Sequence, residues 1–129
     1  MKEDKLLVIT SFPPRKCGIA TYSQDLIQSI EDKYTEDFSI RVCALLKKDD
    51  QLEYPHQVKY FLNTWEREDY ERLAEAINLD QEIRAIYLQH EFGLYGGELG
   101  IYLIDLLERL KVPVFTTFHT VLSAASEAR

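Results

Sequence analysis

Short apolar runs alternate along this chain with segments whose apolar residues recur at helical spacing. The first run, residues 5–10, is apolar at four consecutive positions, which is typical of a strand buried on both faces. The segment at about 19–32 repeats apolar residues at spacings of three and four, which predicts an amphipathic helix. Because strand and helix alternate, we expect an α/β fold: a doubly wound parallel sheet with helices on both faces.

The alternation continues along the chain. Further helices are predicted at about 67–77 and 99–110, and the second of these is apolar on more than one side, so we expect it to be well covered. The default strand order for this pattern is 3-2-1-4-5. Residues 123–129 resemble the start of another helix, so we interpret the 129 residues as a single, partial domain. Further strands are predicted at 39–45, 58–62, 85–89 and 112–118.

Charge and composition narrow the classes of partner. The net charge of −7 argues against nucleic acid. No apolar run approaches the roughly 20 residues that span a bilayer, and we find no signal-peptide pattern, so we expect a cytoplasmic protein. The two cysteines do not form a disulfide framework. Cys43 is predicted in the core, whereas Cys17 is either a plain loop residue or, since a thiol pKa falls at a helix N-terminus, a nucleophile.

The loop from Ser11 to Gly18 joins the first strand to the first helix. A helix N-terminus attracts anions, and Arg15 and Lys16 form a local basic patch beside it. Gly18 either completes a tight turn or lets the backbone approach a ligand. The loop lacks the full dinucleotide-binding fingerprint G-x-G-x-x-G. It also lacks G-x-x-x-x-G-K-[ST], which argues against a nucleotide triphosphatase.

Other polar residues follow the fourth and fifth strands, where ligands of open α/β sheets bind. His90, Glu91 and His119 are either ligand contacts or, for the histidines, side chains capped by backbone. The three are also a candidate metal set, although no H-x-H or H-E-x-x-H spacing supports it. Gly96 and Gly97, which follow Tyr95, are either a second hydroxyl-binding or anion-binding helix start or a flexible turn.

Three motifs together resemble a known family. They are the segments 12–22 (FPPRKCGIATY), 89–97 (QHEFGLYGG) and 118–122 (FHTVL). In this order they resemble the N-terminal half of group 1 glycosyltransferases, the retaining GT-B enzymes of family 4. The resemblance implies a GT-B fold, in which two Rossmann-like domains face one another across a cleft. It implies an enzyme of the hexosyltransferase type, in which this domain holds most of the acceptor site.

The resemblance also implies residue roles. His119 is the catalytic histidine that reaches the transferred sugar, and the donor diphosphate is approached by the loop of Cys17, Gly18 and Ile19. The donor is a nucleotide sugar, UDP- or GDP-linked, and it is a substrate; no metal or other cofactor is implied, because the helix dipole and basic side chains stabilise the leaving diphosphate. The acceptor is a sugar or a glycolipid. Its binding residues would be Arg15, His90, Glu91, Tyr95, Gly96 and Gly97.

The chain departs from the family pattern because the C-terminal donor-binding domain is absent. We therefore expect a truncated N-terminal domain that is inactive alone, and an exposed sheet edge that invites pairing with a second copy. The resemblance allows a cytoplasmic position or a peripheral one at the membrane. Two alternatives remain open: a non-catalytic, flavodoxin-like binding module, and a hydrolase or metal enzyme built on His90 and His119.

Overall fold

The computed structural model describes residues 3–34 and 37–120. Five strands form one sheet, and every pairing between neighbouring strands is parallel. They are β1 (Lys5–Thr10), β2 (Ser39–Leu46), β3 (Val58–Asn63), β4 (Ile83–His90) and β5 (Val114–Phe118). The order β3-β2-β1-β4-β5 confirms the predicted order, and it differs from the flavodoxin-like order 2-1-3-4-5. The flavodoxin-like sheet of the alternative interpretation is therefore wrong.

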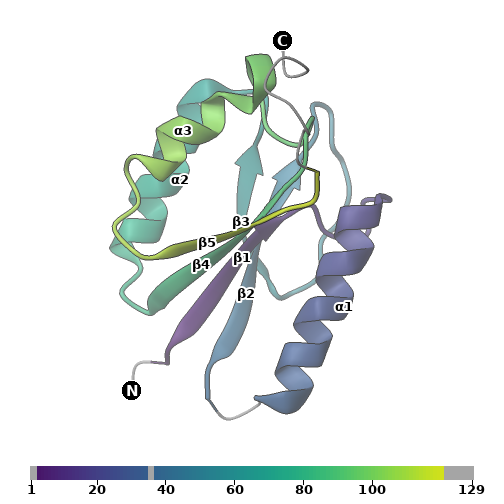
Figure 1. Cartoon of the computed structure of the whole chain (residues 1–129), viewed down its shortest axis with the longest axis vertical. Coiled ribbons are helices and arrows are strands. Elements are labelled where there is room, and N and C mark those ends of the chain that lie inside the picture. The colour runs from purple at the N-terminus through teal and green to yellow at the C-terminus, as the bar shows by residue number, and fades with distance from the viewer. Residues whose placement is uncertain (1–2, 35–36, 121–129) are drawn as a thin grey trace.

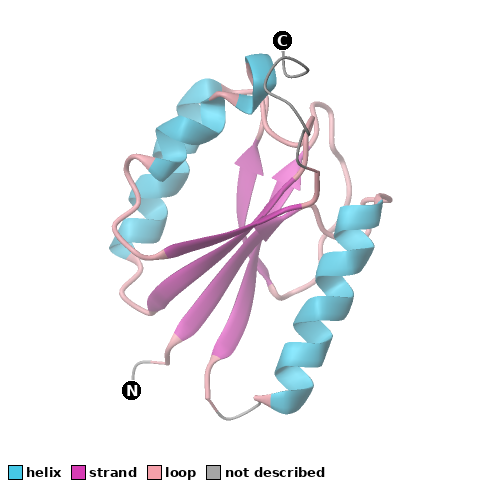
Figure 2. Cartoon of the chain, in the orientation of Figure 1, coloured by secondary structure: helices cyan, strands magenta, loops and turns pink. Residues whose placement is uncertain are grey.

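Helices cover both faces of the sheet (Figure 1, Figure 2). The helix α1 (Gly18–Lys33) lies on one face, and α2 (Arg67–Leu79) and α3 (Tyr102–Leu107) lie together on the other. This arrangement confirms an α/β fold compatible with a Rossmann-like sheet.

The two faces of the sheet bury separate cores. Successive residues of a strand point to opposite faces, so Leu7 and Ile9 of β1 pack toward α2 and α3, whereas Val8 packs toward α1. Tyr70 of α2 is buried in the larger core and Ile27 of α1 in the smaller one. A central parallel strand buried in this way needs apolar residues on both faces, which explains the uninterrupted apolar run of β1.

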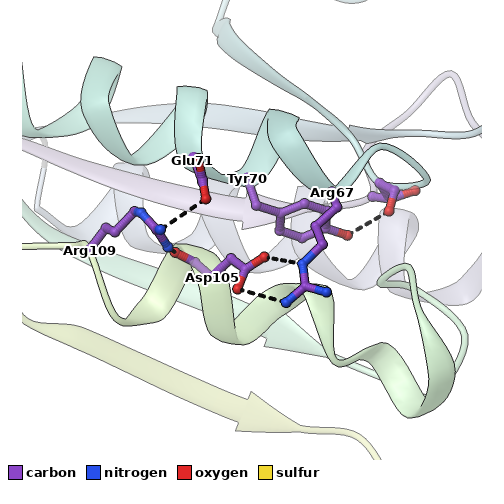
Figure 3. Close-up of polar contacts among 6 residues, drawn as sticks. Arg67, Tyr70, Glu71, Asp105 and Arg109 are labelled. Carbon is purple, nitrogen blue, oxygen red and sulfur yellow. Dashed lines mark hydrogen bonds and ion pairs between the residues drawn. The ribbon is translucent and has the colours of Figure 1, made fainter.

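Two exposed ion pairs join the helices of the larger face (Figure 3). Nε of Arg67 in α2 lies 2.7 Å from Oδ2 of Asp105 in α3. Nη2 of Arg109, just beyond α3, lies 2.9 Å from Oε1 of Glu71 in α2. Exposed pairs of this kind contribute little, about 0–1 kcal/mol each, so the buried apolar residues dominate this contact.

The prediction of a well-covered helix at 99–110 is wrong, both in the length of the helix and in how many of its apolar side chains are buried. The chain instead forms a short 3₁₀ turn, Glu98–Gly100, followed by α3. Leu99 and Gly100 adopt positive φ angles of 56° and 75°, which a continuous helix does not allow. Only Leu103 and Leu106 of α3 are buried, while Ile104 and Leu107 are exposed.

The last strand starts at Val114 rather than at residue 112, and the helix predicted at 123–129 lies outside the described residues.

Candidate functional site

Three loops meet at the carboxyl edge of the sheet. They follow β1, β4 and β5, and β1 and β4 are the neighbours between which the strand order reverses. Ligands of open α/β sheets bind at this point. A backbone hydrogen bond of 2.9 Å from His119 N to His90 O joins the second and third loops. The structure therefore brings the segments that carry the predicted site residues to one edge.

Cys17 caps the N-terminus of α1. Its backbone is extended, and its Sγ accepts a hydrogen bond from Ala20 N at 3.4 Å and lies 3.1 Å from Ser11 Oγ. Burial acts to raise the pKa of the thiol, but the hydrogen bonds from Ser11 and Ala20 and the positive charge of Arg15 lower it below its usual value. The thiol thus serves as a helix cap in the position where serine or aspartate is usual.

Gly18, the first residue of α1, has no structural need to be glycine. Its φ is not positive, and a Cβ built on it meets no heavy atom of the described residues within 4 Å. The first turn of α1 contains no acidic side chain. The positive end of the helix dipole is therefore open to solvent on the side where Gly18 lies. Ile19, next along the helix, is half-buried against the larger core.

Arg15 turns back toward the sheet from the same loop. Its Nη1 donates a hydrogen bond to Leu45 O at 3.1 Å, which fixes the side chain at the carboxyl end of β2. Its Nε is buried and has no hydrogen-bond partner among the described residues. The guanidinium is thus held in place with donor capacity unused.

His119 lies on the face of the sheet that carries α1. Its Nε2 is 2.7 Å from Oε1 of Gln89, a side chain with no solvent exposure. Its ring meets the edge of Tyr22, one turn into α1, with the ring centroids 5.1 Å apart. Since an amide oxygen only accepts, His119 Nε2 carries the hydrogen, and in the neutral ring Nδ1 is left as an acceptor.

His90 follows Gln89 in β4 and so points to the opposite face of the sheet. Its ring stacks on Tyr95 at 5.8 Å between centroids and contacts Phe118 at 5.1 Å. Burial lowers the pKa of His90, against an opposing effect from the charge of Glu91. The side chain lines an apolar pocket of about 420 Å³ beside α3. Its Nδ1 is buried without a hydrogen-bond partner in the described chain.

Glu91 is tied to its own loop. One carboxylate oxygen accepts a hydrogen bond from Thr120 Oγ1 at 3.0 Å, and the other accepts one from Phe92 N at 3.0 Å. These two bonds lower the pKa of the carboxyl. Glu91 therefore joins the loop after β4 to the segment after β5 as a carboxylate.

The loop residues Tyr95, Gly96 and Gly97 have structural roles. Tyr95 is only 5% exposed and donates a hydrogen bond to Gln89 O at 2.7 Å, so its ring supports the loop from within the core. A Cβ on Gly96 would lie 2.0 Å from Thr64 O, and Gly97 has a φ of 81°. Close packing and a positive φ therefore explain both glycines. Gly97 precedes only the short turn at 98–100, not the start of a long helix.

Two residues of the site were missed from the sequence. Gln89 and Tyr22 both lie in segments that carry the family resemblance, but neither was predicted as a site residue. The sequence does carry a signal for Gln89. A parallel strand buried on both faces is usually apolar throughout, and a buried amide needs a hydrogen-bond partner, so a glutamine near the carboxyl end of such a strand implies a polar partner. Tyr22 carries no such signal, because its contact depends on where β5 ends.

Neither a metal centre nor a similar protein points to a function for the described residues. Among residues 3–34 and 37–120, no group of three or more His, Cys, Asp or Glu side chains is arranged to hold a metal ion. No helix in these ranges combines the length and the apolar character needed to cross a bilayer. Comparison of the chain with protein-family models, curated proteins and solved structures found no match.

Proposed function

We propose that this chain is the acceptor-side, Rossmann-like domain of a retaining GT-B glycosyltransferase. In the complete enzyme it would help to move a sugar from a UDP- or GDP-linked donor to a sugar or glycolipid acceptor. The observation that carries the proposal is Gly18, an open glycine at the N-terminus of α1 and at the switch point of the sheet. The motif resemblance supplies the reaction class.

Gly18 supports the proposal because the fold does not explain it. Neither a positive φ nor a close neighbour among the described residues requires a glycine there. A side chain at this position would instead obstruct any group that approaches the start of α1. A diphosphate is such a group, since the positive end of a helix dipole stabilises its charge.

His119 is placed one helical turn away, through its contact with Tyr22. With its Nε2–H donated to Gln89, the neutral ring offers Nδ1 to a sugar hydroxyl. The diphosphate would lie against Cys17, Gly18 and Ile19, and the transferred sugar against His119. Glu91, His90 and Arg15 would line the acceptor side. The developing negative charge on the leaving diphosphate would be stabilised by the helix N-terminus.

Titration of the ¹⁵N-labelled chain tests this assignment. Nucleotide sugars with UDP and with GDP are added, and the amide shifts of Gly18, Ile19 and His119 are followed against those of α2. We expect weak binding that perturbs the first set alone, because in a GT-B enzyme this domain would supply only part of the donor site. Gly18→Ala should remove the response, whereas Ser29→Ala, an exposed change at the far end of the same helix, should keep it. An unchanged response in Gly18→Ala would contradict the proposal.

A further inference from the structure

A basic pocket of about 430 Å³ lies beside the N-terminus of α1. The loop after β1 and the loop after β2 form it, so it opens at the same edge as the candidate site. Four basic side chains and two acidic ones line it, in a chain whose net charge is −7. They are Arg15, Lys16, Lys47, Lys48, Asp49 and Asp50.

The basic side chains of this pocket are not neutralised by ion pairs. Within the described ranges, the ion pairs of the chain involve other residues. Asp50 accepts hydrogen bonds from Leu52 N at 2.9 Å and from Tyr54 Oη at 2.8 Å, so its carboxylate serves its own loop. An excess of positive charge therefore remains in a recess at the edge of the sheet.

Arg15 gives the pocket a fixed donor. Its hydrogen bond to Leu45 O holds the guanidinium, while its Nε is buried without a partner among the described residues. A guanidinium carries five N–H donors, and the hydrogen bond to Leu45 O uses only one of them. A guanidinium presents a planar fork that matches phosphate oxygens, and lysines add point charges around it.

We infer that this pocket binds the phosphate group of a phosphorylated acceptor. That the ligand is an acceptor rests on the proposed function; that it carries a phosphate rests on the pocket alone. Arg15 would contact the phosphate from within the pocket, and Lys47 and Lys48 would close over it from the loop after β2. The same chemistry fits a soluble sugar phosphate and the headgroup of a phospholipid.

The test measures binding of a hexose 6-phosphate, the neutral hexose and inorganic phosphate, together with phosphatidylcholine vesicles with and without phosphatidylglycerol. The variant Lys47→Ala/Lys48→Ala removes two exposed charges. The matched control Lys33→Ala/Lys111→Ala removes two exposed lysines elsewhere and gives the same net charge. We expect the first variant to weaken binding of the phosphorylated ligand about tenfold and the control to leave it unchanged.

If the unmodified chain binds the hexose phosphate and only Lys47→Ala/Lys48→Ala loses this binding, the result supports a phosphate pocket that takes a soluble ligand. If the chain binds only the vesicles that contain phosphatidylglycerol, and the same variant loses this binding, the result supports a phosphate pocket that takes a lipid headgroup. No binding of either ligand, or equal binding by both variants, overturns the inference. Gly18→Ala separates the two proposals, because it should leave phosphate binding intact while it removes the response to nucleotide sugars.

Discussion

Gln89 of β4 and His119, the residue after β5, face one another, with His119 Nε2 2.7 Å from Gln89 Oε1. Gln89 has no solvent exposure, and Tyr95 Oη donates to its backbone oxygen. A buried side chain thus holds the ring of His119, and with Gln89 Oε1 as the acceptor the hydrogen of this contact lies on Nε2. The side chain of Gln89 acts as a positioning group for His119.

This relationship predicts the effect of Gln89→Leu. The substitution removes the acceptor, so the neutral ring of His119 should change from the Nε2–H form alone to a mixture of both tautomers. The loss of one hydrogen bond should lower the free energy of unfolding by about 1 kcal/mol. The ¹⁵N shifts of the ring report the tautomer. Gln89→Glu keeps an acceptor and should keep the Nε2–H form; equal spectra for Gln89→Leu and the unmodified chain would contradict the assignment.

Gly96→Ala and Gly18→Ala should differ sharply in stability. A Cβ on Gly96 meets a backbone oxygen at 2.0 Å, so the loop must shift, at a cost of about 3 kcal/mol or more. The open position of Gly18 accepts a methyl group, and the less flexible unfolded chain should leave stability unchanged or raise it by about 0.5 kcal/mol. Urea unfolding of both variants makes the comparison, and equal losses would show that the loop after β4 relaxes freely.

Tyr70→Phe should lower the free energy of unfolding more than a Tyr→Phe substitution at an exposed position. The Tyr70 hydroxyl donates to Thr64 O at 2.7 Å and accepts from Gly96 N at 2.9 Å, so it joins the loop after β3 to the loop after β4. Its removal leaves Gly96 N without that acceptor, at a cost of about 1–3 kcal/mol. Tyr34→Phe, at an exposed ring, should cost less than about 0.5 kcal/mol. Thermal unfolding of both variants is the measurement.

His90 should make stability depend on pH below neutrality. Burial lowers its pKa below the usual 6.5, so the unfolded chain takes up a proton before the folded one does. The free energy of unfolding should therefore fall as the pH drops from about 7 to about 5, and recover as it rises. His90→Phe keeps a ring and removes the titration, so its stability should change less over this range.

The strands were predictable because a buried parallel sheet demands apolar residues at successive positions. β1 was predicted with the bounds that the structure has, and the order of all five strands followed from the alternation of elements. The failure came at 98–101, where Leu99 takes a positive φ. No local pattern marks a leucine for that conformation; the fit of Gly96 against Thr64 and of Gly97 against Tyr102 sets the path of the chain there.

The place of the candidate site in the fold could be predicted from the sequence, whereas the contacts among its side chains could not. Strand topology alone brings His90, Glu91 and His119 to the edge where α1 begins. Which of them face one another depends on the parity of each residue along its strand: Gln89 and His119 share one face, and His90 points to the other. The family resemblance implied that Tyr95 binds the acceptor, yet its ring fills the core.

The central strand has a consequence for how the chain acquires its structure during synthesis. β1 leaves the ribosome before the other four strands of the sheet, but one of its two partners, β4, lies far along the sequence. Until β4 emerges, one side of β1 has no neighbour to complete its hydrogen bonds. A sheet with such distant pairings folds slowly compared with a helical bundle. The nascent chain is therefore exposed to wrong strand pairing and to chaperone capture throughout the synthesis of the segments between β1 and β4.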